Sequence, residues 1–227
     1  MFSPALRAYD RVVVVVPAHN EKANLPACLR AVLTAALCVP ISVSIVVVLD
    51  DSDDDSARLA GEYGPDVHFV VVDAHNVGAA RAAGFAYARS LFADDTRCWY
   101  ATTDADSRVD PGWLIHQLEL GADMVLGVVR VANWRSHSDD FSGDAAARHV
   151  HGANMGFSAR AYWRVGGFHA LESGEDVDLV ERFEAAGYCV HQDTELSVAT
   201  SARANGRAPH GFASYLRQLG RSAGDCA

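Results

Sequence analysis

The 227-residue sequence carries little basic charge and no long hydrophobic run. Its formal net charge of -10 argues against nucleic acid as the main partner, because phosphate binding requires an excess of Lys and Arg. The same charge disfavours electrostatic binding to anionic lipid. The longest apolar runs, at 12–18 and 43–49, are far shorter than the ~20 residues that a membrane span requires. We therefore expect no transmembrane segment.

Cysteine is also sparse, and the five cysteines form no C-x-x-C pair. Their odd number and scattered positions argue against a disulfide framework or a zinc site. The N-terminus, where Arg7 and Asp10 precede a short apolar run, is not typical of a secretory signal. We expect reduced thiols in a cytoplasmic protein. Peripheral membrane association is the alternative location, and a homodimer is a compatible oligomeric state.

Apolar runs and segments of helical periodicity alternate along the chain, which predicts one α/β domain over residues 1–227. The β-branched runs are typical of strands buried on both faces, so we predict a mostly parallel sheet flanked by helices. Ligands are expected at the carboxyl ends of its strands. The expected strands are 12–16, 44–49, 67–72, 99–107, 124–131 and 151–158, with a strand pair in 188–200. The expected helices are 25–37, 57–63, 77–92, 111–120, 159–165, 175–186 and 210–219.

Two carboxylates one residue apart, Asp104 and Asp106, follow the apolar residues of the fourth expected strand. In an extended segment they would point to the same side and converge on one spot. A hard divalent cation such as Mg²⁺ or Mn²⁺ is held by one or two such carboxylates together with substrate phosphate oxygens. The alternative is an ordinary polar turn after a strand.

Two further polar side chains could bind a nucleobase or phosphate groups. Asp50 ends the second expected strand, where a carboxylate can accept the N–H groups of a nucleobase. Arg81 lies about one turn inside the third expected helix, near enough to its N-terminus to face a base or phosphates. The alternatives are a solvated acidic loop at 51–55, which suits helix capping, and a surface arginine at 81.

Seven blocks of the sequence, in order, resemble the GT-A fold glycosyltransferases of family 2. Such a series is far more specific than any single motif, and it covers about residues 11–190. The blocks are VVPAHNE (15–21), VLDDSDDDSA (48–57), NVGAARAAG (76–84), TDADS (103–107), GANMGFSAR (152–160), VGGF (165–168) and GEDVDL (174–179).

The resemblance implies a Rossmann-like GT-A domain that binds a UDP- or GDP-sugar donor. It divides the chain into a nucleotide-sugar-binding half (11–107), an acceptor half (108–200) and a C-terminal helical extension (201–227). Three residues resemble the first nucleotide-binding loop: Pro17, Asn20 and Glu21. Asp50 resembles the base-reading acid.

The resemblance also implies metal-dependent, inverting transfer of a sugar to an acceptor hydroxyl, with Mn²⁺ or Mg²⁺ as the cation. Asp106 resembles the direct metal ligand, and Asp104 would touch the metal or the ribose. Asp176 resembles the general base, which takes the proton of the acceptor hydroxyl. An acidic first turn of a helix is the alternative for Glu175 and Asp176. His210 is the candidate for a late metal-binding histidine, and a helix-opening surface histidine is its alternative.

Two departures from the family pattern limit the resemblance. Ser52-Asp53-Asp54 replaces the usual Gly-Ser-Thr after the paired acids, and no Gln-x-x-Arg-Trp motif follows Asp176, which argues against a processive polysaccharide synthase. The polar segment 133–148 is expected to be a mobile loop over the site. The rival functions are a catalytically inactive nucleotide-sugar-binding protein, a sugar nucleotidyltransferase and a phosphatase.

Overall fold

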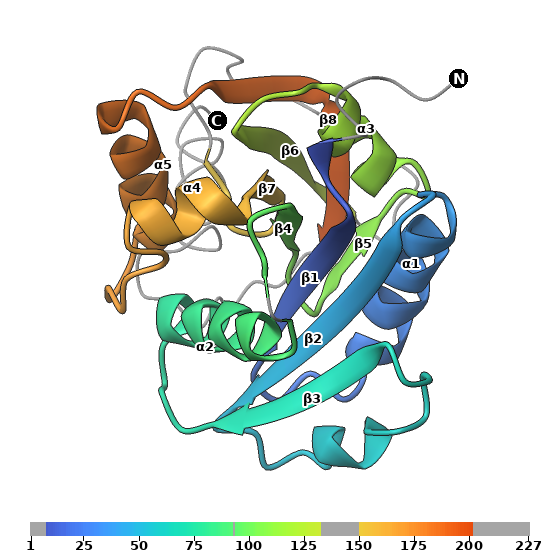
Figure 1. Cartoon of the computed structure of the whole chain (residues 1–227). Coiled ribbons are helices and arrows are strands. Elements are labelled where there is room, and N and C mark those ends of the chain that lie inside the picture. Colours follow the sequence, from blue (N-terminus) through green and yellow to red (C-terminus); the bar gives the residue numbers. More distant parts are fainter. Residues whose placement is uncertain (1–7, 93, 133–149, 202–227) are drawn as a thin grey trace, which may run out of the picture.

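The computed structural model describes residues 8–92, 94–132 and 150–201, which form a mixed sheet with helices on both faces (Figure 1). Its eight strands lie in the order β3-β2-β1-β4-β7-β6-β8-β5. The strands are β1 (Arg11–Ala18), β2 (Ser42–Asp50), β3 (Val67–Val72), β4 (Cys98–Thr102), β5 (Ser107–Val109), β6 (Met124–Ala132), β7 (Met155–Ser158) and β8 (Val190–Ser201). The helices are α1 (Leu25–Leu37), α2 (Val77–Ser90), α3 (Trp113–Glu119), α4 (Ala159–Arg164) and α5 (Glu175–Ala185), with the 3₁₀ turn η2 (Ser56–Leu59).

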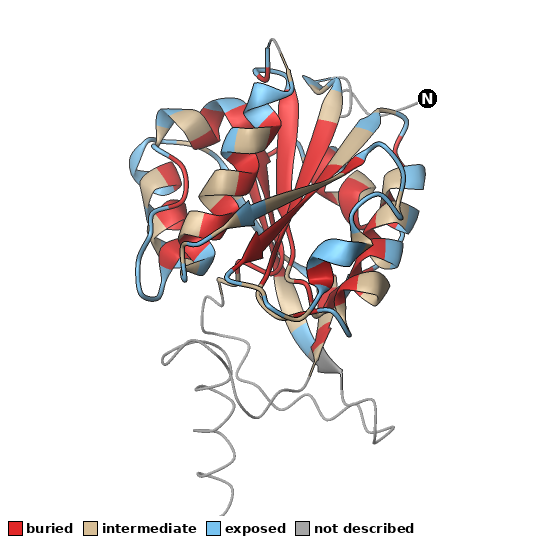
Figure 2. Cartoon of the chain, turned by 90° about the horizontal axis from the view of Figure 1, so that it is seen from below, coloured by how far each residue is buried: buried red, intermediate tan, exposed pale blue. Residues whose placement is uncertain are grey.

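The central strand β1 is buried on both faces, as its unbroken run of valines predicts. Val12, Val14 and Val16 belong to the core on the side of α1 and α3. Val13 and Val15 belong to a second core, which α2, α4 and α5 cover. In Figure 2 the central strands are buried along their length, whereas the exposed residues lie on the outer sides of the helices and in loops. This three-layer arrangement confirms the predicted fold class.

The strands β4 and β5 follow one another in the chain but lie far apart in the curled sheet. Strands β1, β2, β3 and β4 are parallel, and β7 runs antiparallel to both β4 and β6. β5 pairs with β8 at the far edge, although a turn of residues 103–106 alone separates it from β4. That turn therefore passes from the middle of the sheet to its edge. It carries Asp104 and Asp106.

Most predicted elements are confirmed within one to three residues, with a few exceptions. The expected helix 57–63 is a short 3₁₀ turn at Ser56–Leu59, and the expected strand pair in 188–200 is the single strand β8, with a register shift against β6. At the start of α3, Gly112 holds the N-cap position without a capping side chain. The strand β5 was not expected.

Two predicted segments, the loop 133–148 and the helix 210–219, lie outside the described residues. Among the helices that the structure describes, each is too short or too polar to cross a lipid bilayer.

Helix α2 packs closely against β1 and β2 at Gly84. A Cβ atom at this position would lie 2.6 Å from a methyl group of Val15 and 2.8 Å from one of Val48. Because Gly84 has no side chain, α2 can pack this close to the sheet. The same helix carries Arg81 on its buried face, so this packing also determines the position of Arg81.

We predict that Gly84→Ala destabilises the fold, because the added methyl group forces α2 away from the sheet. Overpacking of this kind costs about 1–3 kcal/mol. In a chain of this size the melting temperature should fall by roughly 2–4 °C per kcal/mol, which thermal unfolding followed by circular dichroism measures. Gly112→Ala is the control, since its φ is -81° and no heavy atom lies within 4 Å of the added Cβ. Equal destabilisation of both variants would contradict this account.

Candidate functional site

Asp104 and Asp106 lie in a tight turn directly after β4. The expectation that they belong to an extended strand is wrong, because β4 ends at Thr102 and the N–H of Ser107 donates to the carbonyl of Asp104 at 3.0 Å. The two hydroxyl groups at the end of β8 hold Asp106: Thr200 Oγ1 donates at 3.2 Å and Ser201 Oγ at 2.6 Å. The orientation of the Asp106 carboxylate is therefore set by the turn and by β8. It does not result from the alternation of side chains along a strand.

Arg81 links the acidic turn to the first turn of α5. Its Nη2 donates to Asp104 Oδ1 at 2.9 Å, and its Nη1 donates to Glu175 Oε1 at 2.6 Å. The Arg81 side chain is 3% exposed, and the Phe168 ring lies beside it, 5.5 Å from Cζ. The surface-arginine alternative is therefore wrong. In the described residues the Arg81 side chain binds two carboxylates of the protein itself.

The acidic turn holds more negative charge than Arg81 neutralises. Partial burial raises the pKa of Asp104 above its usual range; Arg81 opposes the rise, and the charge of Asp106 adds to it. Burial also raises the pKa of the nearby Cys28 thiol, and three carboxylates reinforce that rise: Asp104, Asp106 and Glu21. Among the described residues, one oxygen of Asp104 bonds Arg81 and the other accepts no hydrogen bond. Such crowded oxygen ligands suit a hard divalent cation.

The three acids in the first turn of α5 have different partners. Glu175 is buried against Arg81. Asp178 pairs with Arg182 at 2.7 Å and with His169 at 3.0 Å, and its bonds with Arg182 hold its pKa below the usual range. Asp176 is half-buried, and its Oδ2 accepts the backbone N–H of Gly152 at 2.9 Å. Among these three, Asp176 is the acid that forms no ion pair with the described residues.

Gly152 lies between Arg81 and Asp176. A Cβ atom at this position would lie 2.5 Å from three atoms of the Arg81 guanidinium group, so only glycine allows this approach. Its backbone N–H holds Asp176 at the same time. The sequence showed Gly152 as part of a family block but gave no reason for it. Thr200 and Ser201, the partners of Asp106, gave no recognisable signal in the sequence.

The loop after β1 is tied to the loop after β2. Asn20 donates its backbone N–H to Ser52 Oγ at 3.1 Å and accepts the N–H of Asp53 at 2.8 Å. Glu21 is 8% exposed and accepts from Asn24 Nδ2 at 2.9 Å. Pro17 is a buried residue of β1, rather than of the loop, and pairs with Val48. Its missing N–H is tolerated because pairing with β4 ends before this position.

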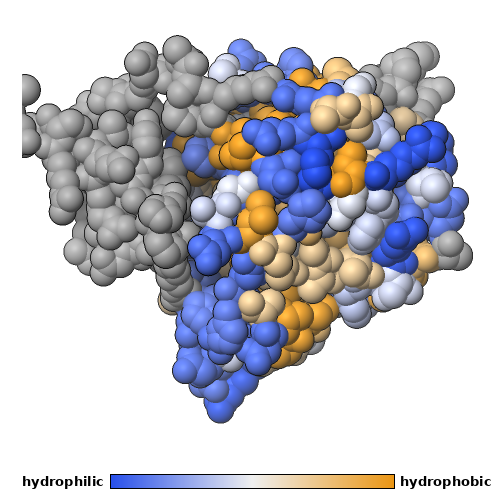
Figure 3. All heavy atoms as spheres, turned by 90° about the vertical axis from the view of Figure 1, so that its left-hand side faces the viewer, coloured by the Kyte–Doolittle hydropathy of each residue, from blue (hydrophilic) through white to orange (hydrophobic). Residues whose placement is uncertain are grey.

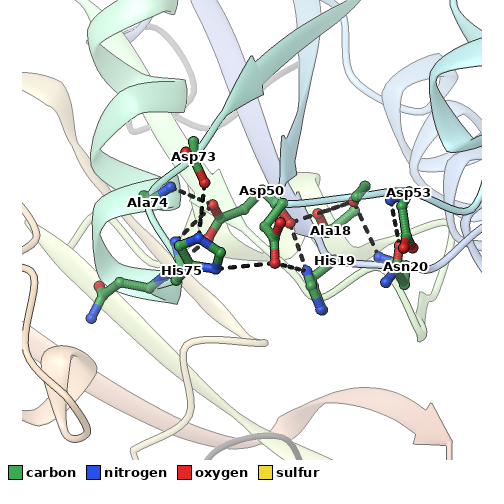
Figure 4. A network of polar contacts seen from close by, with 11 residues as sticks. Ala18, His19, Asn20, Asp50, Asp53, Asp73, Ala74 and His75 are labelled. Carbon is green, nitrogen blue, oxygen red and sulfur yellow. Dashed lines mark hydrogen bonds and ion pairs between the residues drawn. The ribbon is translucent and has the colours of Figure 1, made fainter.

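Asp50 is engaged inside the protein (Figure 4). Its Oδ1 accepts the N–H groups of Ala74 at 2.7 Å and His75 at 3.0 Å, and its Oδ2 accepts that of Asn76 at 2.9 Å. The side chain is 6% exposed, so Asp50 fixes the loop between β3 and α2. These bonds leave one lone-pair position for a nucleobase. Its role as base reader stays a prediction.

Asp51 is exposed next to Asp50 and contacts two histidines. His75 Nδ1 lies 3.0 Å from Asp51 Oδ2, and His19 Nδ1 lies 3.9 Å from the same oxygen. His75 Nε2 lies 2.9 Å from Asp73 Oδ1. Asp51, Asp73 and His75 thus form a three-residue group with a geometry that a metal could use. All three are exposed, and their mutual contacts account for the geometry.

The structure therefore brings the predicted residues together in two places. The first place is the start of α5, which carries Asp176 and lies beside Arg81, Asp104 and Asp106. The second place is the loop after β1, where Asn20 bonds the loop after β2. His210 lies outside the described residues.

Two solved structures share this architecture. TarS of S. aureus in complex with UDP-GlcNAc matches with a TM-score of 0.66 at 12% identity, over 89% of this chain and 61% of that chain. The mannosyltransferase PcManGT from Pyrobaculum calidifontis, in complex with GDP-Man and Mn2+, matches with a TM-score of 0.63 at 18% identity, over 94% of this chain and 62% of that chain. The chain spans less than two thirds of either solved chain. Its fold is that of the GT-A glycosyltransferases.

The sequence comparisons narrow this class to one family. The model of Glycosyl transferase family 2 matches residues 13–166. An uncharacterized glycosyltransferase of Mycobacterium tuberculosis is 32% identical over 214 residues, 88% of this chain and 89% of the relative. The undecaprenyl-phosphate 4-deoxy-4-formamido-L-arabinose transferase of Shewanella sediminis is 30% identical over 224 residues, 92% of this chain and 65% of the relative. The chain belongs to glycosyl transferase family 2.

We predict that Asp50→Asn destabilises the protein, whereas Asp51→Asn leaves stability nearly unchanged. An amide at position 50 cannot accept all three backbone N–H groups, and losing bonds to a buried charge costs about 2 kcal/mol. The exposed contact of Asp51 with His75 is worth less than about 1 kcal/mol. Urea unfolding of both variants measures the difference. A smaller loss for Asp50→Asn than for Asp51→Asn would show that the loop does not depend on Asp50.

Proposed function

We propose that this chain is a metal-dependent, inverting glycosyltransferase that moves a sugar from a nucleotide-diphosphate sugar to an acceptor hydroxyl. The observation that carries the proposal is the junction at Arg81, which joins Asp104 of the acidic turn to the first turn of α5. In this proposal, the donor-binding and acceptor-binding residues lie on the two sides of this junction. The names of the solved neighbours, which include UDP-GlcNAc in one and GDP-Man with Mn2+ in the other, support a donor of this class.

On the donor side, Asp104 and Asp106 would hold Mn²⁺ or Mg²⁺, with His210 as a further candidate ligand. When bound, the cation would neutralise the charge on the diphosphate leaving group. The loops after β1 and β2, which carry Asn20 and Glu21, would bind the nucleoside. We propose Asp51 as the main base-reading acid because its carboxylate is exposed, whereas that of Asp50 is engaged with three backbone amides.

On the acceptor side, Asp176 would act as the general base. In a single in-line displacement, the acceptor oxygen forms a bond to the anomeric carbon while the bond to the diphosphate breaks. The nucleoside diphosphate leaves with the electron pair, and Asp176 takes the hydroxyl proton. Glu175 and Asp178 are less suited to this role, because each is already paired with an arginine.

An isoprenoid phosphate is a second candidate acceptor. The name of the Shewanella relative includes undecaprenyl phosphate. Three apolar side chains near Asp176 are exposed here: Val77 at 39%, Leu171 at 38% and Val177 at 43%. Asn76 Nδ2 donates to the carbonyl of Leu171 at 2.6 Å, which places Leu171 by the start of α2. Figure 3 shows the side of the molecule on the left of Figure 1, where apolar patches lie among polar side chains.

We predict that a nucleoside diphosphate binds more tightly with Mn²⁺ than with EDTA, because the acidic turn otherwise repels the diphosphate. UDP-, GDP- and dTDP-sugars are screened by thermal shift and by slow donor hydrolysis. A ligand at a hundredfold excess over its Kd stabilises the fold by about 2.7 kcal/mol. Binding without turnover would favour the inactive nucleotide-sugar-binding protein. Equal affinity with Mn²⁺ and EDTA would contradict metal dependence.

We predict that Asp176→Asn retains donor binding but slows transfer to a hydroxyl acceptor by about 10²- to 10⁴-fold, the usual contribution of a general base. Asp106→Ala should lose both metal-dependent binding and transfer. Calorimetry and a transfer assay on the two variants separate these roles. An unchanged rate of transfer to the hydroxyl acceptor would show that another group is the base. An isoprenoid phosphate acceptor, which is already ionised and needs no base, should be insensitive to Asp176→Asn when it is assayed in its place.

A further inference from the structure

We infer that Glu175 is a positioning residue for the cation site, acting through Arg81, although it lies on the acceptor-side helix. The inference rests on the proposed function, because it concerns the cation that Asp104 and Asp106 would hold. Glu175 is the buried acid in the first turn of α5 and contacts Arg81 Nη1 at 2.6 Å. It would therefore set the affinity for the metal, without itself touching the metal or the acceptor.

The orientation of the guanidinium group depends on its two carboxylate partners. In the described residues, Nη1 bonds Glu175 and Nη2 bonds Asp104, while the buried Nε has no hydrogen-bond partner. A planar guanidinium fork positions two oxygens at once, which a point charge cannot do. Losing the bond to Glu175 would therefore leave the Asp104 bond as the remaining hydrogen bond that orients Arg81.

The charges of Arg81 and Glu175 also balance one another next to the cation site. Both side chains are almost fully buried, at 3% and 9% exposure, so solvent screens their interaction poorly. With Glu175 in place, the Arg81 charge is divided between two carboxylates. Without the Glu175 charge, Arg81 would hold Asp104 more strongly and compete with the metal for it. The local potential would also become more positive and repel a cation.

Glu175→Gln tests the inference, because it keeps the shape of the side chain and removes its charge. We expect Mn²⁺ to bind the donor-free variant about tenfold more weakly, as measured by titration calorimetry or by the electron paramagnetic resonance signal of free Mn²⁺. Glu181→Gln is the matched control: it makes the same change on an exposed position of the same helix. The control should bind Mn²⁺ like the wild type.

A double variant, Arg81→Met with Glu175→Gln, tests whether the effect passes through Arg81. The double variant removes both charges of the buried pair and so leaves neither of these two charges unpaired, which lets it answer the question if Glu175→Gln alone does not fold. It should bind Mn²⁺ about as tightly as the wild type, because the competing guanidinium is gone. Weak binding by the double variant would overturn the inference.

The outcomes for the single variant distinguish this inference from the proposed function. Wild-type Mn²⁺ affinity in Glu175→Gln, with a loss of transfer alone, would assign Glu175 to the acceptor chemistry and overturn the inference by itself. A wild-type protein that binds neither Mn²⁺ nor any nucleoside diphosphate would overturn the proposed function and the inference together.

Discussion

The two bonds of Arg81 are the interaction on which the rest of the site depends. The side chain leaves the buried face of α2 and joins the turn after β4 to the start of α5, two segments about 70 residues apart in the chain. Loss of Arg81 would leave two carboxylates, Glu175 and Asp104, without their shared positive partner, and a buried charge without its partner is strongly destabilising. Gly84 below it and Gly152 beside it provide the space for this arrangement.

The donor-side loops are held by the protein's own polar groups before any ligand binds. Asp50 fixes the loop after β3 through three backbone amides, and Asn20 fixes the loop after β1 against that after β2. Lys22 adds a further connection, because its backbone N–H donates to Asp54 at 2.6 Å. Much of the acidic run after β2 therefore organises loops, which leaves Asp51 as the exposed acid beside His19 and His75. Such preorganisation reduces the entropy lost on binding.

The acidic side chains around Arg81 differ in their binding partners. Arg81 engages Glu175, Arg182 engages Asp178, and hydroxyl groups at the end of β8 engage Asp106. Asp176 accepts backbone N–H groups of Gly152 and Val177. Asp176 forms no direct ion pair with the described residues, although its charge also helps to raise the pKa of the Arg81 guanidinium. The differences among neighbouring carboxylates thus arise from long-range contacts, because the residue types are nearly the same.

The sequence by itself determined most of the strands, the main helices and the family, because these depend on local periodicity and on short motifs. The valine run of β1 predicted burial on both faces, and the seven blocks named the fold and marked Asp104, Asp106 and Asp176. Tertiary structure alone decided what these side chains contact. The turn after β4, the burial of Arg81 and the engagement of Asp50 depend on residues 23 to 95 positions away. No local pattern encodes such pairs, since sheet curvature and helix packing bring them together.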